Sequence, residues 1–232
     1  MFFFNSSVRI SESGILNNYT DHHCHLLPGV DDGVQHIEET LALLQLMEQQ
    51  GVSNVWFTPH VMEDIPNTPD RLQKRFAEVG YDGGIHLHLG SENMLDTKFS
   101  IDNAKTLGLP GNHILVETSY FTAPYNFKKV LREIQSRGIY PMLAHPCRYQ
   151  YMDLDDYEEL KDMGIHFQLN LPAIMGMYGP GVQKKAYWLL DNEFYSITGT
   201  DTHRLSQYKR FIDAKVPRKR IRQVEELLGT AK

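Results

Sequence analysis

The stretch Asp21-His22-His23-Cys24-His25-Leu26-Leu27-Pro28-Gly29-Val30-Asp31-Asp32-Gly33 decides how this chain is interpreted. Residues 19–25 are predicted to form a β-strand, in which alternate side chains point to the same face. His23 and His25 would therefore project together, with two acids following in a turn. Neutral imidazoles beside a carboxylate are typical ligands of transition metals. The stretch thus predicts a metal site at the end of a first strand.

Similar polar pieces follow other strand-like segments along the chain. They are Thr58-Pro59-His60, Gly90-Ser91-Glu92, Val116-Glu117-Thr118, Ala144-His145-Pro146 and Gly199-Thr200-Asp201-Thr202-His203. The predicted strands span residues 19–25, 52–58, 85–89, 112–117, 139–144, 165–169 and 195–200. Helical patterns are found at residues 37–48, 68–79, 127–137, 155–163, 182–190 and 217–228. This alternation predicts an α/β fold with a parallel sheet, and seven units fit a distorted (βα)7 TIM-like barrel better than an open sheet.

Each of these polar pieces sits at or just past the end of a predicted strand. In a (βα) barrel those ends meet on one face, where active sites are built. The candidate ligands are His23, His25, Asp32, His60, Glu92, Glu117, His145, Asp201 and His203. One zinc ion takes about four ligands, so this set predicts two or three divalent ions. Mixed imidazole and carboxylate donors are compatible with manganese, iron or zinc, and differ from the oxygen-only sites of calcium and magnesium.

Each piece taken singly also has a structural explanation. A lone histidine at a strand end is often a buried group with a hydrogen-bond partner. Asp32 lies in an Asp-Asp-Gly turn that would also cap the following helix. His86 and His88 form a second His-x-His pattern, but they precede the strand end and are assigned a structural role. The common placement of the candidate ligands at strand ends favours the metal site.

Arg148 follows His145 by three residues. A guanidinium beside a metal cluster is suited to bidentate binding of phosphate, and the alternative is an ordinary salt-bridged arginine. Its closeness to His145 favours phosphate binding. Neither Cys24 nor Cys147 begins a Cys-x5-Arg loop, which disfavours a cysteinyl-phosphate mechanism.

Length and composition favour a single barrel domain. The chain has 232 residues, and we expect a lead-in segment at 1–18 and one domain with a C-terminal helix at 19–232. The apolar start at residues 1–4 is expected to pack on the barrel, because it is too short to insert into a membrane. A net charge of −6 gives no basic signature for nucleic acid. Two cysteines imply no disulfide framework and suit a cytoplasmic protein.

The motifs resemble those of the PHP superfamily (polymerase and histidinol phosphatase), and most closely its CpsB/CapC-like protein-tyrosine phosphatase branch in a Bacteroidetes-type form. The residues that carry the resemblance are the stretch 21–33, Thr58-Pro59-His60, Glu92, Glu117, His145-Pro146-Cys147-Arg148-Tyr149 and Asp201-Thr202-His203. The resemblance implies a distorted seven-stranded barrel that holds up to three ions, often manganese. It also implies dephosphorylation of phosphotyrosine, on the tail of a tyrosine kinase of capsule or exopolysaccharide synthesis.

On this interpretation a water activated by the ions attacks phosphorus, while Arg148 holds the phosphate oxygens. His60 and His203 are the candidate proton donors wherever they are not tied to metal. Two alternatives remain: a histidinol phosphatase or other small-molecule phosphatase on the same metals, and a non-catalytic regulatory domain. The oligomeric state is left open.

Overall fold

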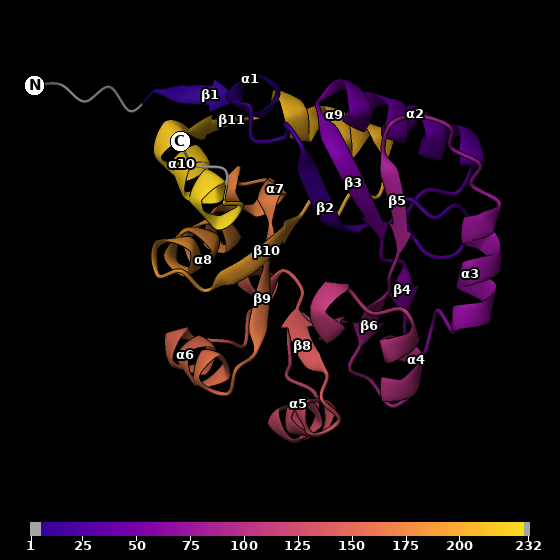
Figure 1. Ribbon diagram of the computed structural model, residues 1–232. Coiled ribbons are helices and arrows are strands. Elements are labelled where there is room, and N and C mark those ends of the chain that lie inside the picture. Colours follow the sequence, from indigo (N-terminus) through magenta and orange to yellow (C-terminus); the bar gives the residue numbers. More distant parts are fainter. Residues whose placement is uncertain (1–5, 230–232) are drawn as a thin grey trace, which may run out of the picture.

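Parallel strands form a ring at the centre of the molecule, and helices surround it (Figure 1). The structure is a computed structural model that describes residues 6–229. The strands of the ring are β2 (Tyr19–Cys24), β3 (Val52–Phe57), β4 (His60–Val61), β5 (His86–Leu89), β6 (Glu92–Met94), β7 (His113–Glu117), β8 (Tyr140–Leu143), β9 (His166–Asn170) and β10 (Tyr195–Gly199). Every predicted strand is present, and the predicted α/β barrel is confirmed.

The ring is built from two sheets, with the orders β2-β3-β5 and β10-β9-β8-β7-β6-β4. It closes between β10 and β2, because the backbone N–H of Asp201 donates to the carbonyl of His23 (2.7 Å) and that of His25 donates to Thr202 (2.9 Å). Two of the predicted strands are followed by a short second strand. β4 follows β3 after Thr58-Pro59, and β6 follows β5 after Gly90-Ser91. Pro59 lacks the N–H that a continuous ladder needs. These breaks distort the barrel on the side of the candidate ligands.

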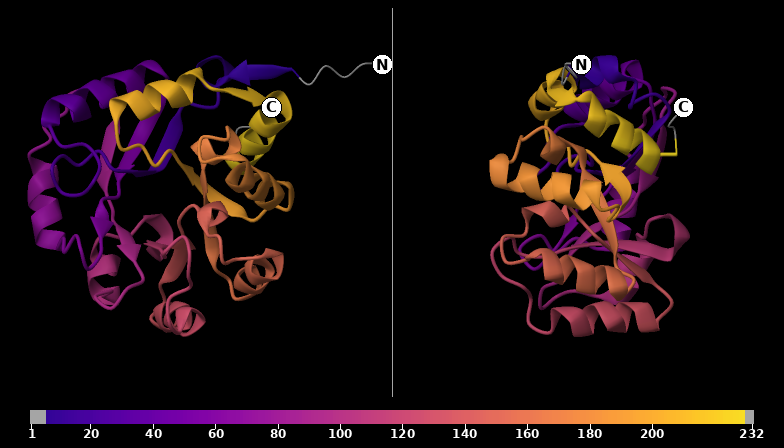
Figure 2. Two further views of the ribbon diagram at one scale, coloured as in Figure 1. Left: turned by 180° about the vertical axis from the view of Figure 1, so that it is seen from behind. Right: turned by 90° about the vertical axis from the view of Figure 1, so that its left-hand side faces the viewer.

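Helices follow the strands and cover the outside of the ring (Figure 2). Their bounds are α2 (Ile37–Gln49), α3 (Pro69–Ala77), α4 (Ile101–Thr106), α5 (Phe127–Ser136), α6 (Leu154–Asp162), α7 (Leu171–Ile174), α8 (Pro180–Asp191), α9 (Leu205–Asp213) and α10 (Arg218–Leu227), with 3₁₀ turns η1 (Pro110–Asn112) and η2 (Pro146–Arg148). Thr68 caps α3, because its side chain accepts from the backbone N–H of Arg71, and Pro69 begins the helix. α6 begins with a reciprocal capping box between Asp153 and Asp156.

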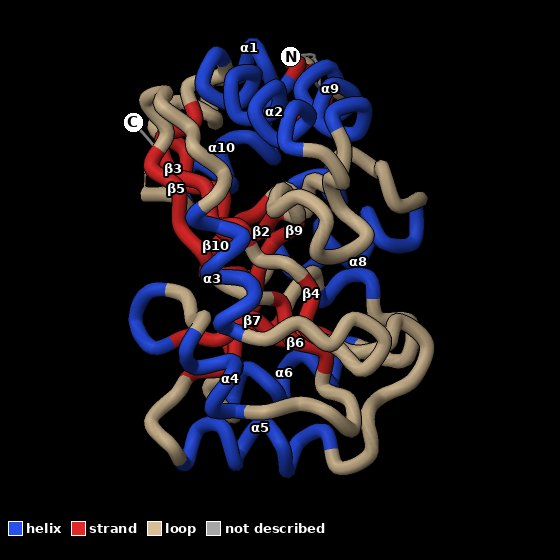
Figure 3. Tube along the Cα trace, turned by 90° about the vertical axis from the view of Figure 1, so that its right-hand side faces the viewer, coloured by secondary structure: helices blue, strands red, loops and turns tan. Residues whose placement is uncertain are grey.

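The lead-in segment joins the end of the chain. β1 (Ser7–Arg9) pairs antiparallel with β11 (Lys215–Pro217), and the short α1 (Ile10–Ser13) connects β1 to the barrel. Figure 3 shows α1 beside α2 and α9 at one end of the molecule. Residues 1–4, which were expected to pack on the barrel, lie outside the described residues. The division at 1–18 and 19–232 stays a prediction.

Apolar side chains fill the barrel beneath the candidate ligands. Leu115 on β7 and Met142 on β8 are buried there together with Ala144 and Leu109. Strand side chains alternate, so Glu117 shares the face of Leu115 and lies one step nearer the carboxyl end. The interior is therefore apolar below and polar at the carboxyl end, which positions a site there. Within the described residues no helix has the length and apolarity to cross a membrane.

Candidate metal centre

The centre gathers side chains from the carboxyl ends of the strands, as predicted. Glu92, the first residue of β6, lies in its middle and is fully buried. Its Oε2 atom lies 3.2 Å from Nε2 of His23, 3.3 Å from Nε2 of His25 and 3.2 Å from Nδ1 of His60. Its Oε1 atom lies 2.9 Å from Nε2 of His145. One carboxylate thus connects four imidazoles from three other strands.

Two further carboxylates flank Glu92. Oδ1 of Asp201 lies 3.5 Å from Nε2 of His23 and 3.4 Å from Nε2 of His25. Glu117, the last residue of β7, places Oε1 2.9 Å from Nδ1 of His60. Both carboxylates are buried, and among the described residues neither forms an ion pair with a lysine. Their positive neighbours are imidazoles, apart from the Arg148 guanidinium beside Asp201.

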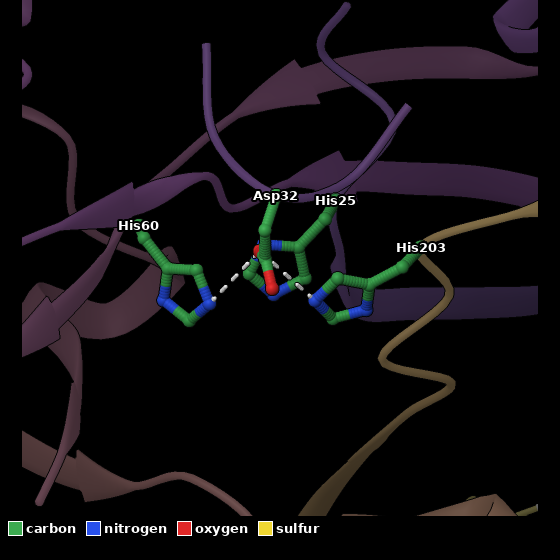
Figure 4. A group of neighbouring side chains, drawn as sticks. All are labelled: His25, Asp32, His60 and His203. Atoms are coloured by element: carbon green, nitrogen blue, oxygen red, sulfur yellow. Dashed lines mark ion pairs between the residues drawn. The ribbon is translucent and has the colours of Figure 1, made fainter. Parts of the chain in front are cut away.

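Asp32 and His203 form the outer edge of the centre. Oδ1 of Asp32 lies between the two rings, 3.5 Å from Nε2 of His60 and 3.4 Å from Nε2 of His203 (Figure 4). The Asp32 side chain is 64% exposed, whereas that of His25 beneath it is fully buried. All the candidate ligands are therefore brought together, with Asp32 at the entrance.

Hydrogen bonds fix which nitrogen of three rings faces the centre. Nδ1 of His25 bonds to Oδ2 of Asp31 (2.8 Å), and Nδ1 of His203 bonds to the carbonyl of Asp201 (2.9 Å). Nδ1 of His23 bonds to Oε1 of Gln168 (3.1 Å). Gln168 donates from Nε2 to the Leu169 carbonyl, which fixes its amide orientation. Each Nδ1 thus donates its proton away from the centre and each Nε2 faces it, which is the orientation that a metal ligand needs once a cation replaces the Nε2 proton.

Several buried polar atoms of the centre form no hydrogen bond with any residue that the structure describes, although most of them make close ion-pair contacts. They are Oε2 of Glu92, Oε1 of Glu117, Nδ1 of His60 and Nδ1 of His145. Nε2 of His23 and Nε2 of His25 are only 3.1 Å apart. Two nitrogen donors at about 2.0 Å from a tetrahedral ion are separated by about 3.3 Å. Such atoms are costly to bury unless a cation satisfies them, so the residues present fit divalent metal.

The donors form three overlapping groups in which one atom per residue lies within 4.8 Å of the others. The groups are His25, Asp32, His60 and His203; His23, His25 and Glu92; and His60, Glu92 and Glu117. His25, His60 and Glu92 each belong to two of them. Overlap of this kind is expected where ligands bridge neighbouring ions.

Opposite charges control the protonation of the centre. Burial opposes the charge on His23, but the carboxylates of Glu92 and Asp201 prevail and raise its pKa to about 9. Burial also opposes ionisation of Glu92, yet the neighbouring His23 and His60 hold its pKa well below the usual range. Glu92 is therefore ionised at neutral pH, and a bound cation would replace the second proton of His23.

The backbone is strained at two of the candidate ligands. His145 and Asp201 have φ angles of 32° and 51°, in the left-handed region that residues other than glycine rarely adopt. Each follows the last residue of its strand closely, and the unusual angle turns the side chain back toward the centre. Strain of this kind is concentrated at functional sites.

Arg148 lies beside the centre rather than on the outer surface. Its Nη1 donates to Oδ2 of Asp201 at 3.0 Å, and its side chain is 22% exposed. The guanidinium is held between two aromatic rings, 4.2 Å from the centroid of Tyr120 and 4.7 Å from that of Tyr178. Asn170 donates to both Asp201 and Tyr178, at 2.9 and 3.2 Å. The guanidinium therefore has a defined position from which it can reach a bound anion.

The sequence analysis missed several supporting residues. Asp32 was predicted as a ligand and Asp31 was given no role. The buried carboxylate of Asp31 bonds to His25 and accepts from the backbone N–H of His60 (3.0 Å). Gln168 and Asn170, two residues apart at the end of β9, carried the same alternating pattern as the first strand. By contrast, the contacts of His88 are with Trp56 and Asn54, in keeping with its structural assignment. Tyr178, with Gly179, Pro180 and residues 168–171, belongs to the sequence that resembles the Bacteroidetes-type form, but that resemblance gave it no role, and no pattern indicated Tyr120.

Comparison with known proteins agrees with this geometry. The chain is 27% identical over 206 residues to the tyrosine-protein phosphatase CpsB of Streptococcus pneumoniae, covering 80% of this chain and 83% of the relative. It is 24% identical over 196 residues to the tyrosine-protein phosphatase YwqE of Bacillus subtilis, covering 79% and 76%.

A solved structure, described as YwqE from Bacillus subtilis and CpsB from Streptococcus pneumoniae, unique metal-dependent tyrosine phosphatases, has the same fold. Its TM-score is 0.72 at 22% identity, covering 92% of this chain and 89% of the other. The model of the family described as capsular polysaccharide synthesis, CpsB/CapC, matches residues 19–222, which include every candidate ligand. The chain therefore belongs to the CpsB/CapC family.

Proposed function

We propose that this protein is a metal-dependent tyrosine-protein phosphatase that hydrolyses phosphotyrosine on a protein. The observation that carries the proposal is the buried cluster around Glu92, whose unpartnered donors face one another beside the Arg148 guanidinium. Cations and a guanidinium side by side are suited to a phosphoryl group. The relatives named above act on phosphotyrosine according to their names, which supports the choice of substrate.

The donor set supports two or three divalent ions as the cofactor, with manganese favoured and iron or zinc as alternatives. His23, His25, Asp32, His60, Glu92, Glu117, His145, Asp201 and His203 would hold them. When bound, the ions would lower the pKa of a water and neutralise the charge of the phosphoryl group. The apolar plug below the centre keeps bulk water from the buried donors.

The chain's own residues would orient the phosphoester. Arg148 presents a rigid fork of donors to the phosphate oxygens, and Tyr120 and Tyr178 restrict its movement. The leaving group is a phenolate, whose parent pKa of about 10 makes it a better leaving group than an alkoxide. His203, at the outer edge, and His60 are the two candidates to donate a proton to it, and only a ring that is not bound to an ion could do so.

We place the substrate on a bacterial tyrosine kinase of capsule or exopolysaccharide synthesis, acting in the cytoplasm. The family's description as capsular polysaccharide synthesis supports this assignment. The net charge of −6 does not favour nucleic acid as a partner. Intact donors at every candidate position argue against a regulatory domain without activity.

The experiment that tests this function compares hydrolysis of a phosphotyrosine peptide with that of histidinol phosphate, after chelation and after manganese is restored. We expect turnover that depends on manganese and favours the peptide. Preference for histidinol phosphate would overturn the substrate and keep the metal chemistry. Failure to hydrolyse either compound, with metal bound, would overturn the phosphatase assignment.

Ligand variants test the residues that are assigned to the centre. His145→Ala and Glu117→Ala should each abolish turnover, because each removes a buried donor. Metal content and the circular dichroism spectrum of each variant separate loss of metal from loss of fold. Unchanged turnover in a folded variant would remove that residue from the centre.

A further inference from the structure

A large cavity opens beside the candidate centre and is not used by the proposed chemistry. It has a volume of about 730 Å³. Two segments line it, the loop after β7 with the start of α5 and the segment that leads from η2 into α6. Both come directly from the centre, since the first follows Glu117 and the second follows Arg148. The two segments that line the cavity therefore both begin at the candidate centre.

The wall between the centre and the cavity is rigid. Tyr120, which stacks on Arg148, accepts a backbone hydrogen bond from Gln150 at 2.7 Å. The hydroxyls of Thr118 and Tyr151 are 2.7 Å apart, which joins the two segments a second time. Phe121 directly follows Tyr120 and lines the cavity, so a chain that leaves the centre past Tyr120 would next meet this lining.

The lining of this cavity includes apolar side chains, one of which is largely exposed. In the part of the chain that the structure describes, four large apolar side chains are exposed, and one of them, Phe121, lines the cavity. Phe121 is 68% exposed and lies there with Tyr151, Met152 and Leu160. Apolar side chains grouped at a concave surface mark binding sites.

Charge distinguishes this cavity from its neighbour. Tyr125, on the same loop, lines a second cavity of about 680 Å³. The second cavity is lined by the acids Glu63, Asp96, Asp102 and Glu133, with Arg137 as its basic residue. The first is lined by Lys128, Lys129 and Asp156.

Lys129 is the available charge in the first cavity. Lys128 pairs with Glu159 at 2.6 Å, and Asp156 is engaged in the cap of α6. Among the described residues Lys129 has no ion-pair partner. An anionic polypeptide would therefore be attracted to the first cavity and repelled by the second.

We propose that the cavity lined by Phe121, Met152 and Lys129 binds the polypeptide next to the phosphotyrosine, taking an apolar side chain of the substrate and pairing Lys129 with a substrate acid. The inference rests on the proposed function. It adds that the protein selects phosphotyrosine by the residues within about three positions of it, in addition to the phosphoryl group. Apolar area buried by one such side chain is enough for about a tenfold preference.

The test uses the full chain with manganese and a set of peptides that differ near the phosphotyrosine. The peptides carry leucine, glycine or glutamate at each position within three residues, and para-nitrophenyl phosphate reports the chemistry alone. We expect Phe121→Ala to lower the ratio of kcat/KM for the leucine peptides to kcat/KM for the aryl phosphate by about fivefold to tenfold. Ala123→Trp, which fills the cavity, should do the same.

Matched controls are available on the same surface. Tyr125→Ala removes an aromatic that is 92% exposed on the same loop but lines the acidic cavity, and it should leave the ratio unchanged. Lys129→Glu should lower kcat/KM for the glutamate peptides most, whereas Lys209→Glu on α9 should not. Equal effects of Phe121→Ala and Tyr125→Ala, or equal loss for leucine and glycine peptides, would overturn the proposal.

A binding measurement separates this inference from the proposed function. Fluorescence anisotropy with peptides that carry a non-hydrolysable phosphonate in place of the phosphotyrosine reports the cavity without turnover. Weaker binding by Phe121→Ala in a protein that hydrolyses nothing would support the cavity and overturn the phosphatase. A dimer that Phe121→Ala dissociates in light scattering would assign the cavity to a second copy of the chain and overturn the peptide assignment.

Discussion

At the scale of single residues, neighbouring acids in one turn have different surroundings. The Asp31 carboxylate is buried and bonds to His25. Burial opposes its charge, but the charge and hydrogen bond of His25 outweigh burial and lower the pKa of Asp31 to about 2. A carboxyl whose folded pKa lies below the unfolded value stabilises the fold above about pH 4, and this stability is lost as pH falls toward 2. Relative to the ordinary aspartate pKa of 3.8, this shift contributes about 2 kcal/mol of stability at pH 7.

We therefore expect Asp31→Asn to unfold about 2 kcal/mol more easily than the parent in urea at pH 7, both metal-free. The gap should narrow as pH falls from 4 toward 2. Asp32→Asn is the matched control, since that side chain is largely exposed and should change metal-free stability by less than about 0.5 kcal/mol. A pH-independent gap for Asp31→Asn would show that its contribution is packing rather than charge.

A second prediction at this scale concerns the aromatic rings that stack on the Arg148 guanidinium. Tyr178→Leu should lower kcat/KM for an aryl phosphate by about fivefold, because a cation–π contact of about 1 kcal/mol that orders the guanidinium is lost. Tyr178→Phe keeps the ring and should restore most of the activity, although it loses the bond from Asn170. Steady-state kinetics with both variants decides the point, and equal loss in the two would attribute the effect to the hydroxyl.

At the scale of elements, the strands were predicted well because each is a short apolar or alternating run that ends near a glycine, a proline or a polar candidate ligand. The interruptions were not predicted. β4 and β6 resume the line of β3 and β5 for two or three residues, and this short pairing of His60 with Glu92 has no periodic pattern to reveal it. The β1–β11 pairing joins segments about 200 residues apart in sequence, a contact that local patterns cannot indicate.

The closure of the barrel between β10 and β2 depends on a small residue. A Cβ atom added to Gly199 would lie 2.5 Å from Cβ of His23 and 3.0 Å from its backbone nitrogen. We expect Gly199→Ala to destabilise the protein by about 1–3 kcal/mol in urea unfolding and to weaken metal binding, because β10 must move away from the ligand strand. Gly181→Ala on α8 is the control, since nothing lies within 4 Å of the added atom. Replacing glycine by alanine at a helical position of that kind should raise the free energy of unfolding by up to about 1 kcal/mol.

At the scale of the whole molecule, the position of the site followed from the sequence and its internal arrangement did not. Parallel strands of a barrel share one carboxyl face, so His23, Glu117 and His145 had to converge whatever the details of packing. The roles within the cluster depend on side-chain contacts between distant segments. Tertiary structure alone decides that Asp31 orients His25 while Asp32 stays exposed. It also decides that Tyr178 covers Arg148.

Because the donors come from both sheets of the ring, the loss of metal should be felt by the entire fold. Carboxylates and imidazoles of at least five strands meet at Glu92, and without a cation several buried atoms lack partners. Ions at about a hundred times their dissociation constant stabilise the folded state by about 2.7 kcal/mol. For a chain of this length that corresponds to a fall of about 5–10 °C in Tm after chelation.

Manganese should restore Tm and magnesium should restore little, since imidazole donors do not suit magnesium. Scanning calorimetry of the treated and reloaded protein measures both effects, with Glu92→Gln as the variant that manganese should not rescue. If the chelated and reloaded proteins melt at the same temperature, the cluster does not hold its ions as a structural unit.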